Sequence, residues 1–73
     1  MSKDARLEAN ARLFHYDPHL EKAADLFDAD PYEWAKLPVV LQDRSGMYRD
    51  ARDTYRRAVA AGVIPDDRGP SAA

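Results

Sequence analysis

Proline divides this sequence into segments of helical length. Asp17-Pro18 and Asp30-Pro31 each place a favourable N-cap residue directly before a proline, which suits the first position of a helix. Pro38 interrupts the chain again soon after the second pair. Because proline disrupts the interior of helices and sheets, regular elements must begin or end at these points. We therefore predict helices that start at both Asp-Pro pairs.

Apolar spacing predicts the first two helices. Leu7, Ala11 and Phe14 recur at the period of one helix face, so a first helix should span about residues 3 to 15 or 16. Ser2 is its expected cap. The second helix should span about residues 18 to 27 or 28, with Leu20 and Phe27 on its apolar face.

The third helix is short and carries the only tryptophan. Tyr32, Trp34 and Leu37 make it apolar on most sides, which is typical of a helix wedged between longer ones. Glu33 follows Asp30 at the spacing of a capping box. We expect this helix to end near residue 36, and Trp34 to fill the space beside the alanines at 51 and 58.

The last segment, residues 38–61, can be interpreted in two ways. Leu41, Tyr48 and Tyr55 lie seven apart, and residues 44, 51 and 58 follow the same period without a phase shift, which favours one long helix. Ser45-Gly46 leaves open a break into two helices, because serine caps helices and glycine weakens them. Gly62 should end the segment, and residues 66–73 should form a flexible tail.

These segments predict an all-α fold, a small helical bundle of three main helices plus one short helix, with the long helix at the C-terminus. Residues 1–65 should form a single domain. A chain of 73 residues has a small core and, without cysteine, no disulfide to supplement it. Dense packing, self-association or a partner must then contribute. The expected core residues are Leu7, Phe14, Leu20, Phe27, Trp34, Leu41, Tyr48 and Tyr55.

Hydropathy and composition indicate where such a chain acts. No apolar run approaches the roughly 20 residues of a membrane span, and the N-terminus lacks the apolar run of a secretory signal. We therefore expect a cytoplasmic protein with no membrane partner. Eight arginines against three lysines, with many alanines, are typical of a GC-rich coding genome. A bacterial or phage accessory protein would suit this composition.

Charge is unevenly distributed along the chain. Residues 17–36 contain six acidic residues and two lysines, whereas residues 37–73 contain six arginines and five aspartates. The four-residue spacing of three acids predicts an acidic face on the second helix, and several arginines share a flank of the last helix. Each set forms either a solvated surface or a docking site. The candidate partner-binding residues are Asp17, Glu21, Asp25, Arg49, Arg52, Arg56 and Arg57.

Few residues could carry chemistry. His15 and His19 have metal-ligand spacing, but the Asp17-Pro18 pair breaks the helix between them. The acids at 28, 30 and 33 lack the central glycine and closing glutamate of a calcium loop. The sequence has no cysteine, few serines and no glycine-rich phosphate loop. We expect no catalytic residues, no metal site, no cofactor and no small-molecule substrate.

The sequence is best interpreted as a non-enzymatic protein–protein interaction module, namely an adaptor, regulator or assembly component that acts through helix faces. Its partner would be another protein or a second copy of the chain. The alternative is a nucleic-acid-binding regulator that uses the arginine flank. A net charge of −2 argues against a generic nucleic-acid binder, so this alternative ranks second.

Overall fold

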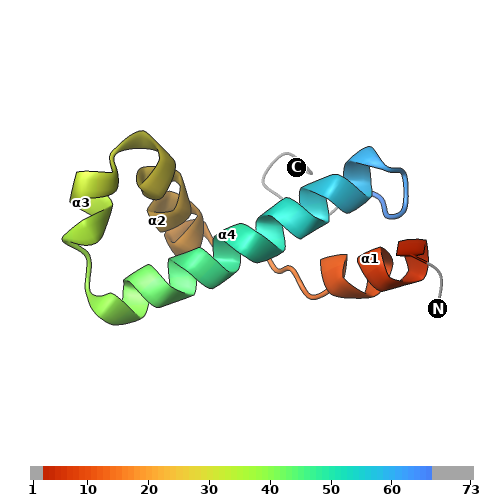
Figure 1. Ribbon diagram of the computed structural model, residues 1–73, viewed down its shortest axis with the longest axis horizontal. Coiled ribbons are helices and arrows are strands. Elements are labelled where there is room, and N and C mark those ends of the chain that lie inside the picture. Colours follow the sequence, from red (N-terminus) through yellow and green to blue (C-terminus); the bar gives the residue numbers. More distant parts are fainter. Residues whose placement is uncertain (1–2, 67–73) are drawn as a thin grey trace. The chain divides into compact units, whose positions relative to one another are not determined.

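A computed structural model describes residues 3–66, and within this range the chain forms four helices and no strand (Figure 1). The all-α fold class is confirmed, including the short third helix and the long last one. The helices are α1 (Lys3–Ala11), α2 (Pro18–Ala29), α3 (Pro31–Ala35) and α4 (Val39–Ala60).

The chain divides into two compact units, and the expected single domain over residues 1–65 stays a prediction. The central unit runs from Asp17 to Arg49 and contains α2, α3 and the first half of α4. The terminal unit combines the N-terminal segment up to Tyr16 with the chain from Asp50 onward. It therefore contains α1 and the second half of α4, so α4 contributes to both units.

The first helix is shorter than predicted. α1 ends at Ala11, whereas the apolar spacing predicted a helix to residue 15 or 16. The last turn tightens, since the amides of Leu13 and Phe14 bond to carbonyls three residues back, at 3.2 and 3.1 Å. Leaving the helix exposes Leu13 and lets Phe14 pack against Tyr55, with ring centroids 5.0 Å apart. A tertiary aromatic contact thus prevails over the helical pattern.

Both Asp-Pro pairs start helices as predicted. Asp17 is the N-cap of α2, and its carboxylate accepts the amides of His19 and Leu20 at 2.9 and 3.2 Å. Asp30 caps α3 by accepting the amide of Glu33 at 3.3 Å. The reciprocal half of the capping box does not form, because the Asp30 amide bonds to the Leu26 carbonyl at 2.8 Å. The carboxylate of Glu33 instead accepts a bond from Lys36.

The long last segment is one helix, and its division into two helices at Ser45 is wrong. α4 continues from Val39 through Ser45-Gly46 to Ala60. Ser45 does not cap a new helix; its hydroxyl donates to the Gln42 carbonyl at 3.0 Å, one turn back in the same helix. The continuous seven-residue spacing of apolar residues therefore predicted the helix correctly.

The buried face of α4 is rotated from the predicted one. Tyr48 and Tyr55 are buried and Leu41 is half-buried, as the first series of the pattern requires. The second series predicted residues 44 and 51, but the structure buries the next residues along, Ser45 and Arg52. Both are polar, so a search for apolar periodicity passes over them.

The C-terminal end of α4 has the predicted glycine stop. Gly62 adopts a positive φ of 74°, and its amide bonds to the Val59 carbonyl. The amide of Val63 bonds to the Ala58 carbonyl at 2.9 Å, which completes a Schellman motif. Ile64 is buried beyond it.

The predicted flexible tail lies mostly outside the described residues. Its first residue, Asp66, is described, and its carboxylate accepts the Tyr55 hydroxyl at 2.8 Å. Residues 67–73 are not described. The prediction for that segment therefore stays a prediction.

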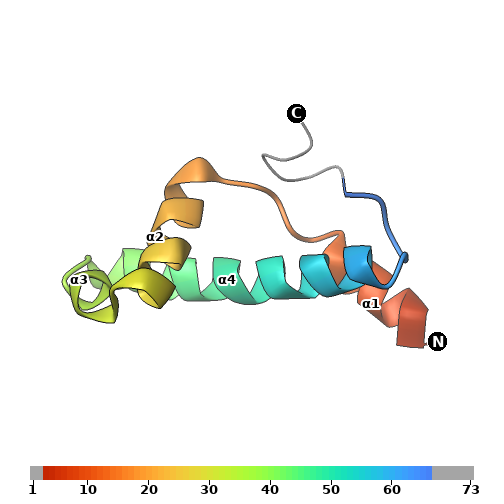
Figure 2. The same ribbon diagram turned by 90° about the horizontal axis from the view of Figure 1, so that it is seen from above.

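In the terminal unit, α1 lies beside the C-terminal turns of α4 in both views (Figures 1 and 2). Ala11, Phe14, Tyr55 and Ala58 are buried in this unit. The two small alanines come from α1 and α4 respectively, which permits close approach of helices.

In the central unit, α2 and α3 pack against each other, and α3 leads into the first turn of α4 (Figure 1). The Trp34 ring meets Phe27 edge to face, with centroids 4.8 Å apart. Trp34 is therefore wedged among residues of its own unit. The alanines at 51 and 58, where it was expected to pack, belong to the terminal unit.

Candidate interaction surface

The start of α4 is held in place by side-chain hydrogen bonds between α4 and the α3 segment. The indole N–H of Trp34 donates to the Ser45 hydroxyl at 3.0 Å, and Ser45 is only 1% exposed. The Gln42 amide donates to the carbonyls of Ala35 and Leu37 at 2.9 and 2.8 Å. These bonds satisfy carbonyls that the end of α3 leaves without helical partners. The orientation of α4 in the central unit is thereby fixed.

Two further contacts tie α4 to α2 within the central unit. The hydroxyl of buried Tyr48 donates to the Glu21 carboxylate at 2.6 Å, a short charge-assisted bond. Arg49 reaches Asp28 with two hydrogen bonds, the shorter of 2.8 Å, and its guanidinium lies 5.0 Å from the Phe27 ring centre. Together these residues define the inner side of α4.

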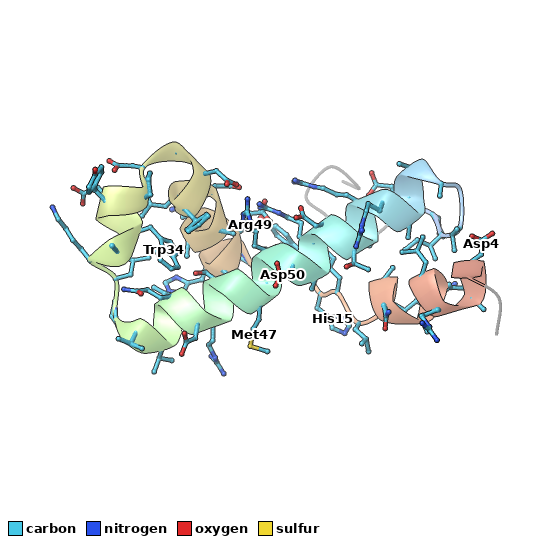
Figure 3. All side chains as sticks on the ribbon, in the orientation of Figure 1. Asp4, His15, Trp34, Met47, Arg49 and Asp50 are labelled. Atoms are coloured by element: carbon cyan, nitrogen blue, oxygen red, sulfur yellow. The ribbon has the colours of Figure 1, made fainter. Side chains whose placement is uncertain are left out.

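The outer side of α4 in this unit carries large apolar side chains in solvent. Val39, Val40 and Met47 are 69%, 68% and 73% exposed. Met47 projects from the side of the helix opposite to α2 and α3 (Figure 3). Helical geometry agrees, because Met47 lies about 200° around the helix from buried Ser45.

Val40 and Met47 lie seven residues apart, so they differ by only about 20° in direction and share one face. Asp43 and Arg44 lie between them on the same two turns, and both are exposed. Neither takes part in an ion pair with another residue of the described range 3–66. We call Val40, Asp43, Arg44 and Met47 the outer stripe.

The sequence contains a signal for the outer stripe that a search for a single apolar face passes over. Such a search assigns Val40 only to the apolar start of the helix. Val40 and Met47 are spaced seven residues apart and lie on a different face of the helix from Ser45. The helix therefore has a second apolar face, besides the one that contains Tyr48. Two apolar faces on one helix are the pattern that predicts this surface.

The predicted acidic residues of α2 differ in their surroundings. Asp17 caps α2, and Glu21 is half-buried and accepts the Tyr48 hydroxyl. Asp25 is exposed. Two of the three carboxylates thus already serve the fold of the central unit, and the set does not form one open acidic face.

The predicted arginine flank is also divided. Arg49 is engaged with Asp28, and Arg52 is 5% exposed. Arg56 and Arg57 are exposed, and Arg57 donates to the Thr54 hydroxyl one turn back. Only two of the four arginines therefore present their charge openly.

The predicted core residues range from buried to exposed. Phe14, Tyr48 and Tyr55 are buried. Phe27 is 38% exposed, because Trp34 and Arg49 cover only part of its ring. The half-buried residues of the set are Leu7, Leu20, Trp34 and Leu41.

Open hollows lie on the described surface of the terminal unit. One of about 500 Å³ lies between α1 and α4 and is lined by residues that include Asp4, Arg6 and Arg57. Another, of about 550 Å³, lies along α4 beside Asp53 and Arg56. Both combine acidic and basic side chains. Neither therefore presents a single charge to a ligand.

The candidate metal residues do not gather. His15 and His19 are exposed, and within residues 3–66 no group of three or more histidine or carboxylate side chains could hold a metal ion. The acids at 28, 30 and 33 are each used elsewhere, by Arg49, by the α3 cap and by Lys36. Nor is any helix in the described part of the chain both long and apolar enough to cross a membrane.

In comparisons with known proteins, no family model, no curated protein and no solved structure matches this chain.

Proposed function

We propose that this chain is a small, non-enzymatic protein–protein interaction module that acts through a helix face. One observation carries the proposal, namely the exposure of Val40 and Met47 on the outer side of α4. Long apolar side chains on a rigid helix are anchors that a protein partner can cover. Contacts on the inner side hold this helix, so the face is presented in a defined orientation.

Nucleic-acid binding through the arginine flank has less support. Phosphate contacts require cations that are free to reach the backbone. Arg49 is engaged with Asp28 and Arg52 is buried, which leaves Arg56 and Arg57 beside Asp53. The apolar surface on the outer side of α4 is therefore better suited to bind a partner than the basic one.

Site-specific photo-crosslinking in cells of the native host tests the proposal. A photoreactive residue at position 47 should give covalent adducts with a polypeptide, because this position lies within the covered face. The matched control carries the same residue at Lys22, which is exposed on α2 outside the outer stripe. Polypeptide adducts at 47 that exceed those at 22 are expected. Equal or absent adducts at both positions would contradict the proposal.

A further inference from the structure

The two charged residues of the outer stripe lie on opposite sides of its apolar pair. Successive residues of an α-helix differ by about 100° in direction, and Val40 and Met47 together form a narrow apolar seam. Asp43 lies about 50° to one side of this seam, and Arg44 lies about 50° to the other side. The outer stripe therefore has a negative edge and a positive edge.

Both edges are available to a partner. Asp43 and Arg44 are exposed, and neither takes part in an ion pair with another residue of the described range 3–66. The apolar seam is more than two-thirds exposed at both of its positions. It lies in the central unit, on the part of α4 that hydrogen bonds of Gln42, Ser45 and Tyr48 hold in place. This unit therefore presents the seam and its two charged edges in a defined orientation.

A second copy of the chain does not match this surface. In an antiparallel pair related by a two-fold axis, each edge meets the same edge of the other copy, so Asp43 lies beside Asp43 and Arg44 beside Arg44. In a parallel pair the edges match, but the same face of α4 continues to Ala58, eleven residues beyond Met47. Ala58 is completely buried within the terminal unit, so this face is not open along the whole helix. The surface therefore favours a different polypeptide.

We infer that the outer stripe binds an amphipathic helix of a different protein, whose own apolar seam is flanked by one basic and one acidic residue. The inference rests on the proposed function and names the class of its partner. Apolar residues seven positions apart on the bound helix cover Val40 and Met47. The basic residue faces Asp43 and the acidic residue faces Arg44, so opposite charges meet at both edges.

The order of the two charges along the bound helix sets its direction on α4. In antiparallel contact each edge faces the edge of the same hand, so the base follows the first apolar residue after three positions and the acid after four. In parallel contact the edges are exchanged, and the acid precedes the base. Either order gives two attractive contacts, whereas a helix with two like charges gives one attractive and one repulsive contact.

The contact is small. Two helical turns provide less than the roughly 800 Å² per partner of a stable protein complex, so a single helix should bind weakly and reversibly. Dissociation constants near about 1 mM are expected, and nuclear magnetic resonance titration measures this range.

Helical peptides with different edge charges test the inference. All contain two leucines seven positions apart, with a side-chain staple on the far face, because short isolated helices are marginal in water. They differ only in the two edge residues, which are one lysine and one aspartate in either order, two aspartates, or two lysines. Titration of the wild-type chain should give both mixed peptides a dissociation constant lower by about threefold or more than that of either like-charged peptide.

Charge-reversal variants should change this preference in opposite ways. Asp43→Arg gives the outer stripe two positive edges, so the peptide with two aspartates should become the tightest by about threefold or more. Arg44→Asp gives it two negative edges, so the peptide with two lysines should become the tightest. A ranking of peptides that stays the same in both variants would overturn the inference.

Matched controls separate the edges from general charge effects. Asp53→Arg and Lys22→Glu make the same kind of charge change at exposed positions outside the outer stripe, so the mixed peptides should remain the tightest. Met47→Gln removes apolar surface from the seam and should weaken all peptides alike. Circular dichroism of each variant should match that of wild type, because these positions are exposed.

The direction of the bound peptide gives an independent readout. A nitroxide label at the peptide N-terminus should broaden the Met47 amide signal when the base precedes the acid, because that peptide runs antiparallel to α4. The peptide with the reverse order should broaden the Val40 amide signal instead. The same direction for both mixed peptides would overturn the assignment of the edges.

Two further outcomes would overturn the inference. One is the absence of binding by both mixed peptides at about 1 mM. The other is a dimeric mass of the chain alone in sedimentation equilibrium with Met47 at the interface, which would make a second copy the occupant. The crosslinking experiment keeps the proposed function separate. Polypeptide adducts at position 47 sustain the interaction module even if no peptide binds, and their absence overturns the module whatever the peptides do.

Discussion

At the scale of single residues, Ser45 has an unusual position for a serine. It lies inside a helix, is almost completely buried, and accepts the Trp34 indole N–H while it donates to the Gln42 carbonyl. Both hydrogen-bonding functions of the hydroxyl are thus satisfied. This small polar residue connects α3 to α4 more specifically than an apolar one could.

We predict that Ser45→Ala lowers the free energy of unfolding by about 1–2 kcal/mol. The indole N–H would lose its acceptor in a part-buried position, and such a group is costly to leave unsatisfied. Urea denaturation followed by circular dichroism measures the loss.

A double-mutant cycle isolates the hydrogen bond. Trp34→Phe removes the indole N–H, so Ser45→Ala should cost clearly less in that background than in wild type. An equal cost in both backgrounds would mean that the bond does not stabilise the fold.

The sequence predicted that Trp34 packs inside the fold, but it did not predict the acceptor of its indole N–H. The proline-bounded segment, rich in apolar residues, was sufficient to predict a wedge. The acceptor depends on which face of α4 turns inward, and that face is marked by Ser45, which has no apolar signature. The packing of Trp34 could be predicted because its side chain is large and apolar. The inward position of Ser45 could not, because it depends on a single hydrogen bond.

At the scale of elements, two glycines of the last segment have opposite roles. Gly46 lies within α4, is exposed, and a Cβ atom added there would meet nothing within 4 Å. Gly62 stands after the helix with a φ of 74°, a conformation that side chains rarely adopt. The first is a weak point in a helix, and the second is a requirement of its end.

Alanine at the two glycines should therefore change stability in opposite directions. Gly46→Ala should raise the free energy of unfolding by about 0.5–1 kcal/mol, because it restores helix propensity in open space. Gly62→Ala should lower it by about 1 kcal/mol, because it strains the left-handed residue of the Schellman motif. Thermal melts of both variants, each compared with wild type, check the signs. A destabilised G46A would show that α4 bends at this residue.

Element boundaries were predictable where local chemistry decides them. Asp17 and Asp30 start α2 and α3, and Gly62 ends the last helix, because a cap depends on residues a few positions apart. The end of α1 was not predictable in this way. Phe14 leaves the helical pattern to meet Tyr55, which is far away in sequence. The outer stripe was missed for a different reason, since an apolar residue alone does not show whether its face is covered.

At the scale of the whole molecule, each unit of the described chain contains a small cluster of packed side chains. One contains Phe14 and Tyr55 in the terminal unit, and the other contains Trp34 and Ser45 in the central unit. Each unit has about 40 residues or fewer, and chains of that size seldom fold without disulfides, metals or association. Because α4 is a continuous helix that contributes to both, we expect loss of structure in one unit to remove support from the other.

We therefore predict that both units unfold in a single transition. Trp34 fluorescence reports on the central unit alone, whereas far-ultraviolet circular dichroism reports on the helices of both, so coincident curves in urea indicate one cooperative step. Phe14→Leu, in the terminal unit, should shift both curves equally, by about 1–3 kcal/mol, since it removes the ring that packs on Tyr55. Leu13→Ala, at the exposed neighbouring position, should shift neither. If Phe14→Leu moved the circular dichroism curve and left the tryptophan curve in place, the units would fold independently, and α4 would then join them without coupling their stabilities.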